Sequence, residues 1–278
     1  MLLLLILFFV FGISVGSFLN VVAYRSIHGG SVFIGNSVCP KCRHKLFPVD
    51  LVPVVSYLLL GGSCRYCKKK ISPQYPLVEV ATGILFALAF YVWSSSAGYQ
   101  LSSLPAGEAG FLYKDLFGLI YLLFVVSVLI VLFATDIVDG LLPNSIVLPA
   151  IAAVAVFKLG FLLFSDSVSV SSLAMDLTAS FLVASTFLAI VYFSGEKALG
   201  GGDVKLVFLI GLALGWLNFL LALFLGFLTG GFVAVMLIIT GKKRFGQTVA
   251  LGPFLTFGAL LALFWGHEIL DLYLKAIL

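Results

Sequence analysis

Charged residues are scarce in this chain. Only 10% of its 278 residues are Asp, Glu, Lys or Arg, whereas 62% are hydrophobic. A mean hydropathy of +1.21 excludes an ordinary soluble domain. Several apolar runs are long enough to cross a bilayer, which takes roughly 20 residues each. We therefore expect an all-α, polytopic membrane protein whose helices pack through small residues, in line with its 28 glycines.

The apolar runs predict about eight transmembrane helices. The first run has no Lys or Arg ahead of it and no Ala-x-Ala cleavage pattern behind it, so it does not read as a signal peptide. We expect a retained helix with its N-terminus outside. The predicted spans cover residues 1–24, 76–94, 117–135, 144–164, 173–193, 203–217, 219–240 and 249–274.

The basic residues support this orientation. All of them except Lys114, Lys158 and Lys275 then face the cytoplasm, as the positive-inside rule requires. The net charge of +4 suits a cytoplasmic face that meets anionic lipid, and it is no evidence for nucleic-acid binding. The predicted parts are a first transmembrane helix at 1–24, a cytoplasmic zinc-binding loop at 25–75 and a seven-helix membrane domain at 76–278.

All four cysteines lie in the loop after the first helix, as Cys39, Cys42, Cys64 and Cys67. Two Cys-x-x-Cys turns at this spacing predict a closed, structural Cys₄ zinc site. Disulfides are disfavoured in a reducing cytoplasm, and a redox pair lacks its usual βαβ context. Zinc binding supplies roughly 10–16 kcal/mol of folding free energy in small zinc units, which a short loop needs.

Two acids stand at the edges of apolar runs. Asp136 closes one run, and Asp203 opens another directly after Gly200, Gly201 and Gly202. An acid at the centre of a span costs about 2.5–3.5 kcal/mol, so an acid here calls for a function or a neutralising partner. The topology puts both acids at the cytoplasmic face. The glycines let other backbone or a substrate strand approach closely, and we predict that they contact substrate.

Two facing carboxylates suit aspartyl proteolysis. One takes a proton from water while the other, protonated, polarises the scissile carbonyl. A helix N-terminus favours Asp203 as the anion, and Asp136, near a helix C-terminus, is then the acid. The alternative is that both acids are interfacial residues, solvated or paired with Lys197 and Lys205.

A membrane transporter is the alternative from another functional class, with Asp136 and Asp203 as a proton relay. A relay predicts further polar residues near the middle of the spans. The third to eighth spans carry few apart from scattered Ser and Thr and Asn218, which disfavours the transporter.

Ordered motifs along nearly the whole chain resemble the bacterial type IV prepilin peptidases of pilus and type II secretion systems. Besides Asp136 and the cysteine pairs, the motifs are 16–25 (GSFLNVVAYR), 56–58 (SYL), 71–79 (ISPQYPLVE), 142–143 (LP), 200–206 (GGGDVKL) and 252–254 (GPF). Val138 and Asn144 stand where many members carry an acid.

The resemblance implies a Gly-x-Gly-Asp intramembrane aspartyl protease of the inner membrane. Such enzymes cut the basic leader from prepilins or pseudopilins, usually after Gly and before Phe, and commonly methylate the new N-terminus with S-adenosylmethionine. By motif match, Asp136 and Asp203 are the catalytic pair, the cysteines bind zinc, and the zinc loop is associated with methyl transfer. Glu79 is predicted either to contact the leader or new amine, or to serve as a first-turn acid of its helix.

Overall fold

The computed structural model describes residues 1–31, 37–96, 116–164, 169–196, 199–242 and 250–277. Within these ranges the chain is helical, with two isolated β-bridges and no β-strand, so the predicted all-α class is confirmed. The chain divides into two units, an N-terminal unit of Met1–Ser95 and a C-terminal unit of Ser96–Leu278. Each unit is described separately below.

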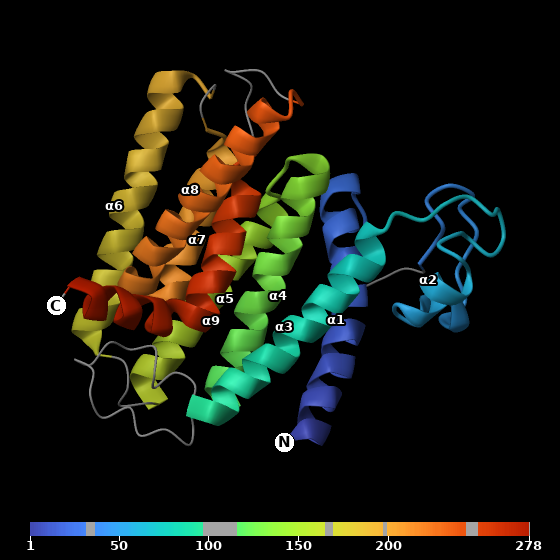
Figure 1. The fold of residues 1–278 in the computed structure, drawn as a ribbon, viewed down its shortest axis with the longest axis horizontal. Coiled ribbons are helices and arrows are strands. Elements are labelled where there is room, and N and C mark those ends of the chain that lie inside the picture. The colour runs from blue at the N-terminus through green and yellow to red at the C-terminus, as the bar shows by residue number, and fades with distance from the viewer. Residues whose placement is uncertain (32–36, 97–115, 165–168, 197–198, 243–249, 278) are drawn as a thin grey trace. The chain divides into compact units, whose positions relative to one another are not determined.

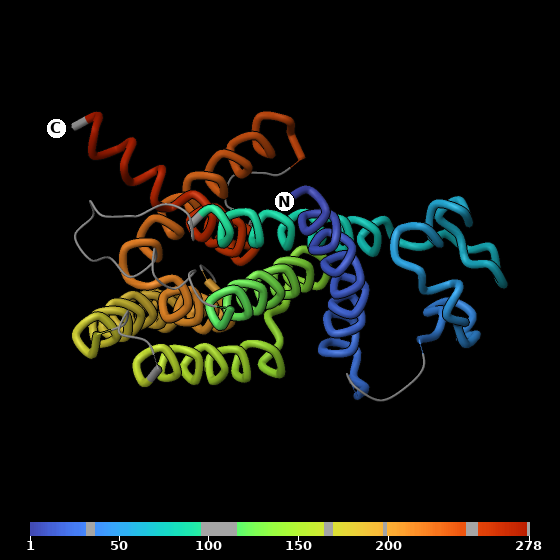
Figure 2. Tube along the Cα trace, turned by 90° about the horizontal axis from the view of Figure 1, so that it is seen from below, coloured from blue at the N-terminus to red at the C-terminus, as the bar shows by residue number. Residues whose placement is uncertain are grey.

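The N-terminal unit consists of two long helices and the loop between them. Helices α1 (Leu2–His28) and α3 (Gln74–Ser96) cross each other (Figures 1 and 2), and the loop contains the short helices η1 (Pro48–Leu51) and α2 (Val55–Leu59). Glycines make the crossing close, because a Cβ at Gly12 or Gly16 would collide with α3, and one at Gly83 would collide with α1.

Six helices lie in the described residues of the C-terminal unit. They are α4 (Leu116–Asp139), α5 (Asn144–Phe164), α6 (Val170–Ser194), α7 (Gly201–Leu214), α8 (Trp216–Ile239) and α9 (Gly252–Ile277). All except α7, together with α1 and α3, are long and apolar enough to span a membrane, so seven described helices meet that criterion. The sixth predicted span exists as α7, but its 14 residues are only about 21 Å long and fall short of the hydrocarbon core.

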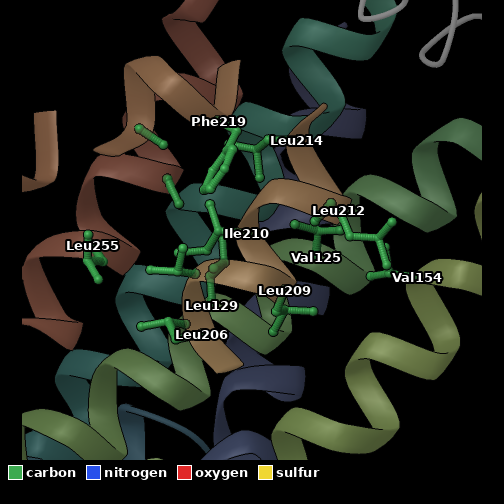
Figure 3. Packing of buried hydrophobic residues seen from close by; sticks show 14 of the residues in the cluster. Val125, Leu129, Val154, Leu206, Leu209, Ile210, Leu212, Leu214, Phe219 and Leu255 are labelled. Atoms are coloured by element: carbon green, nitrogen blue, oxygen red, sulfur yellow. The ribbon is translucent and has the colours of Figure 1, made fainter. Parts of the chain in front are cut away.

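Helix α7 forms the centre of the C-terminal unit. It packs against α5, α6, α8 and α9, and α4 packs against α5 and α9. Leu206, Ile210 and Leu212 of α7 are buried and point in different directions into the surrounding helices (Figure 3). A helix that is apolar on every side is stable only inside such a bundle, which explains why so short an apolar segment is retained there.

A buried ion pair lies beside the break between α7 and α8. Only Gly215, at φ 78°, separates the two helices. The backbone N–H of Trp216 donates to the Asp176 carboxylate over 2.8 Å, and Lys158 Nζ lies 2.6 Å from the other oxygen of that carboxylate. The side chains of Lys158 and Asp176 are 3% and 1% exposed. Because both side chains are buried, the carboxylate satisfies the freed N–H and the lysine neutralises the carboxylate.

This pair corrects the expectation that the later spans hold few polar residues beyond Ser, Thr and Asn218. Lys158 and Asp176 were overlooked there because each is a single charge within a long apolar run. Lys158 was assigned to the outer face and is buried instead. Their polar atoms have partners within the bundle, so they form a closed structural contact and add nothing to a proton path.

Neutralising one member of this pair destabilises the protein. We expect Lys158→Met to lower the free energy of unfolding by about 3–5 kcal/mol, because it leaves a buried carboxylate uncompensated. Lys158→Met combined with Asp176→Asn should recover much of this loss, because the amide oxygen still accepts from Trp216. Thermal unfolding in detergent measures both variants. Strictly additive losses in the double variant would show that the two side chains are not coupled.

Candidate active site and metal site

Three helix ends of the C-terminal unit bring the two predicted catalytic acids together. Asp136 lies in the last turn of α4, Asp203 in the first turn of α7, and Gly252 is the first residue of α9. The Asp136 side chain is buried and that of Asp203 is partly buried. Residues far apart in the sequence therefore place two carboxylates at one end of the helix bundle.

The spacing follows from the geometry around Gly252. A Cβ atom built there would overlap Asp136 Oδ2 and would lie 3.6 Å from Asp203 Oδ1. Carboxyl oxygens of both acids thus lie within 4 Å of a single point, and glycine is the residue that leaves this point free. The two acids meet, as a catalytic pair requires.

The alternative pairing with lysine finds no support among the described residues. Lys205 Nζ donates to Asn144 Oδ1 over 2.7 Å and thereby ties the start of α7 to the start of α5. No ion pair of Asp136 or Asp203 is found in the described part of the chain. Lys197, the other suggested partner, lies outside the described residues.

The three glycines before Asp203 differ in their surroundings. A Cβ at Gly202 would lie 3.1 Å from Cβ of Leu142, so this glycine lets α7 begin against the segment that follows Asp136. The N–H of Gly200 donates to Asp203 Oδ2 over 3.2 Å, which caps α7. A Cβ at Gly201 would meet nothing within 4 Å. Contact of these glycines with substrate stays a prediction.

The role of Gly252 was missed at the sequence level, although its motif had been noted. The sequence did indicate a helix start here, because Gly252 directly precedes Pro253 at the beginning of an apolar run. A glycine at that position also leaves the backbone accessible. What the sequence could not indicate was that Asp136 occupies the space where its side chain would be.

In the N-terminal unit, the four cysteines form a group that could hold a metal ion. Their Sγ atoms all lie within 4.8 Å of one another, and those of Cys39 and Cys67 are 4.0 Å apart. A tetrahedral zinc site with Zn–S bonds of about 2.3 Å places its sulfurs about 3.8 Å apart, so the arrangement fits one metal. None of the four forms a disulfide.

The two cysteine turns share one backbone geometry. In the first, Cys39 N–H donates to the carbonyl of His44, and its own carbonyl accepts from Arg43. In the second, the Cys64 N–H donates to the carbonyl of Lys69, and the Cys64 carbonyl accepts from the N–H of Lys68. Arg43 and Lys68 both have φ near +60°, which turns the chain back after each second cysteine. Each turn thereby presents two sulfurs to the same point.

Asp50 joins the segment between the turns to the second turn. It accepts from Arg65 Nε over 2.6 Å, from the Tyr66 hydroxyl over 3.0 Å and from the N–H of Phe47 over 3.2 Å, which caps η1. Desolvation raises the pKa of this carboxyl, but the three donors outweigh it and hold the pKa below its ordinary value. Asp50 is therefore ionised at neutral pH and braces the loop.

The thiol of Cys39 ionises more readily than an ordinary cysteine. Burial raises the pKa of Cys39, but hydrogen bonds from the backbone of Cys42 and Lys41 and from neighbouring thiols outweigh it and lower the pKa to about 7. Metal binding needs thiolates, and here one forms readily near neutral pH.

Glu79 connects this loop to the helix pair. It is 8% exposed and lies beyond the first turn of α3, so its interpretation as a first-turn acid is wrong. Its carboxylate accepts the N–H of Val54 over 2.7 Å and a hydrogen bond from Ser17 of α1. Val54 has φ +60°, an uncommon value for a β-branched residue, and Glu79 stabilises it there. Contact of Glu79 with a leader or an amine stays a prediction.

Together, these features define a multi-pass helical membrane protein with a carboxylate pair at its helix ends and a group of four cysteines that could hold a metal ion. Family models match both units: the bacterial peptidase A24 N-terminal domain over residues 10–93 and the type IV leader peptidase family over residues 123–235. The chain belongs to the type IV leader peptidase family.

Curated relatives agree along nearly their whole length. The chain is 31% identical to the prepilin leader peptidase/N-methyltransferase of Bacillus subtilis, over 96% of both chains. It is 29% identical to that of Aeromonas hydrophila and 28% identical to that of Pseudomonas aeruginosa, in each case over at least 95% of this chain and 91% of the relative. No solved structure matches the chain.

The cysteine group predicts a measurable metal content. We expect purified protein to carry one zinc ion per chain, and replacement of any one of Cys39, Cys42, Cys64 or Cys67 by Ser to remove most of it, because a tetrahedral site loses a ligand. Elemental analysis by mass spectrometry measures the metal, with His28→Ala as the matched control. Full zinc occupancy in two or more of the serine variants would contradict a Cys₄ site.

Proposed function

We propose that this chain is an intramembrane aspartyl endopeptidase that removes the leader peptide from type IV prepilins or pseudopilins and then N-methylates the new N-terminus. The convergence of Asp136 and Asp203 beside Gly252 carries the peptidase part of this proposal. The names of the full-length relatives, all prepilin leader peptidase/N-methyltransferases, support both parts.

The chemistry follows from two neighbouring carboxyl groups that share one proton, because mutual repulsion disfavours two charges. The N–H of Gly200 and the start of α7 favour Asp203 as the anion that takes a proton from water. The resulting hydroxide adds to the scissile carbonyl carbon while Asp136, as the acid, protonates the carbonyl oxygen. Collapse of this intermediate breaks the C–N bond, and a proton passes to the leaving amine.

The second activity joins a methyl group to the amine that cleavage releases. S-adenosylmethionine supplies that methyl group, and none of the described residues is assigned to hold it. The cysteine site fits zinc in a structural role, because four thiolates complete its coordination and leave no position for a substrate. It stabilises the loop that Glu79 and Asp50 hold in place.

The proposed setting is the bacterial inner membrane, with the helices as spans. The distribution of basic residues favours both termini on the periplasmic side and the carboxylate pair at the cytoplasmic face, next to anionic lipid. A carboxylate pair at this face lies where the basic leader of a prepilin, in the cytoplasm, joins the prepilin's apolar membrane helix. A transporter is not favoured, since the additional buried charges, Lys158 and Asp176, pair with each other.

The carboxylate pair predicts a characteristic loss of activity. We expect Asp136→Asn and Asp203→Asn each to lower kcat/KM for prepilin cleavage by at least about 10³-fold, and the double variant to lose little more, because the two acids act as a unit. Cleavage of a purified prepilin in detergent measures this. Asp139→Asn, an exposed acid on the same helix end, is the control and should cleave normally. Substantial activity in both single variants would rule out the pair.

Gly252 provides an independent test of the geometry. We expect Gly252→Ala to lower kcat by about 10²-fold or more, because the new methyl group displaces the Asp136 carboxyl from its position. Gly231→Ala in α8 is the matched control, since a Cβ there meets nothing within 4 Å. Both variants should keep the wild-type melting temperature to within a few degrees. Normal cleavage by Gly252→Ala would contradict the proposed position of the acid.

A further inference from the structure

A cavity of about 800 Å³ lies against Asp136 in the C-terminal unit. Its walls come from α4, α8 and α9, and apart from Asp136 they are almost wholly apolar and rich in aromatic rings. Its lining includes Phe133, Phe232, Val233, Phe254 and Phe257. The proposed peptidase chemistry assigns no role to this space.

From Asp136 the cavity extends along the outer side of α4, α8 and α9, toward the middle of these helices. Asp136 is three residues from the end of α4, and Phe133 is about one turn further into that helix. On α9 the walls come from the first two turns, at Pro253, Phe254 and Phe257. On α8 they come from Leu228 to Val233, at least one turn before the helix end at Ile239. A chain that enters this space from the carboxylates therefore runs into the membrane.

The chemistry of the walls restricts the occupant to apolar groups. Among the described lining residues the one hydroxyl is that of Thr229, and it is already bonded to the carbonyls of Leu225 and Gly226 of its own helix. Phe232 and Phe257 are 67% and 41% exposed, so the cavity is also reached from the lipid-facing surface. The volume exceeds that of one side chain and suits several apolar side chains on successive residues.

We propose that this cavity binds the apolar side chains that directly follow the scissile bond, at the start of the substrate's membrane helix. The inference rests on the proposed function, because it needs a peptide bond held between Asp136 and Asp203. It makes Phe232, Val233 and Phe257 specificity-determining residues. Binding of these side chains seats the peptide bond at the carboxylates and selects substrates whose mature end begins with large apolar residues.

The test compares two prepilins, one natural and one in which the large apolar residues among the first three positions after the scissile bond are replaced by Ala. For wild-type protein in detergent we expect kcat/KM to be at least about 10-fold higher for the natural substrate. Val233→Trp, which occupies part of the cavity, and Phe232→Ala, which removes one wall, should reduce this ratio to below about 3. The ratio is taken within each variant, so partial misfolding cancels.

Phe224→Ala is the matched control. Phe224 lies on the same helix as Phe232 and is 62% exposed, but it does not line the cavity, so its variant should keep the wild-type ratio. A wild-type ratio in both Val233→Trp and Phe232→Ala would overturn the inference and leave the peptidase proposal intact. A wild-type protein that cleaves neither prepilin would overturn the proposed function and this inference with it.

Discussion

The C-terminal unit depends on one constraint, which is that a buried break between two helices must find partners for the backbone groups freed there. Helix α7 is too short to cross, yet it is buried on all sides among longer helices. Its far end is held by Asp176, which accepts from the first N–H of α8 and is neutralised by Lys158. Its near end begins with the glycines and Asp203. Because the far end is fixed, the near end is fixed too, and Asp203 stands opposite Asp136.

The loop of the N-terminal unit also depends on polar contacts. A loop with little apolar core of its own needs polar ties, and Glu79, Asp50 and the cysteines supply them. Glu79 joins the loop to the helix pair at Val54, and Asp50 joins its middle to the second cysteine turn. A metal ion held by the four cysteines would add its binding free energy to these polar contacts.

Features that depend on residue type and spacing could be predicted from the sequence. The cysteine spacing predicted a single metal group, and the topology placed Asp136 and Asp203 on one face before their distance was known. Features that depend on three-dimensional packing could not. The charges of Lys158 and Asp176 look isolated in the sequence because their partner lies on another helix. Glu79 was placed too early in its helix because the start of α3 at Gln74 is not marked by a hydropathy change. The fit of Asp136 into the space beside Gly252 depends on the approach of α9 to α4, which no local pattern encodes.

The Lys158–Asp176 pair also bears on how the chain enters the membrane. A lysine or an aspartate inserted alone at the centre of a span costs about 2.5–3.5 kcal/mol. Helices α5 and α6 are consecutive, so both charges of the pair are present before α7 and α8 are synthesised. An approach of α5 to α6 at that stage spares the separate cost of each charge. The contact that later supports the break after α7 is thus available from the moment its two helices reach the bilayer.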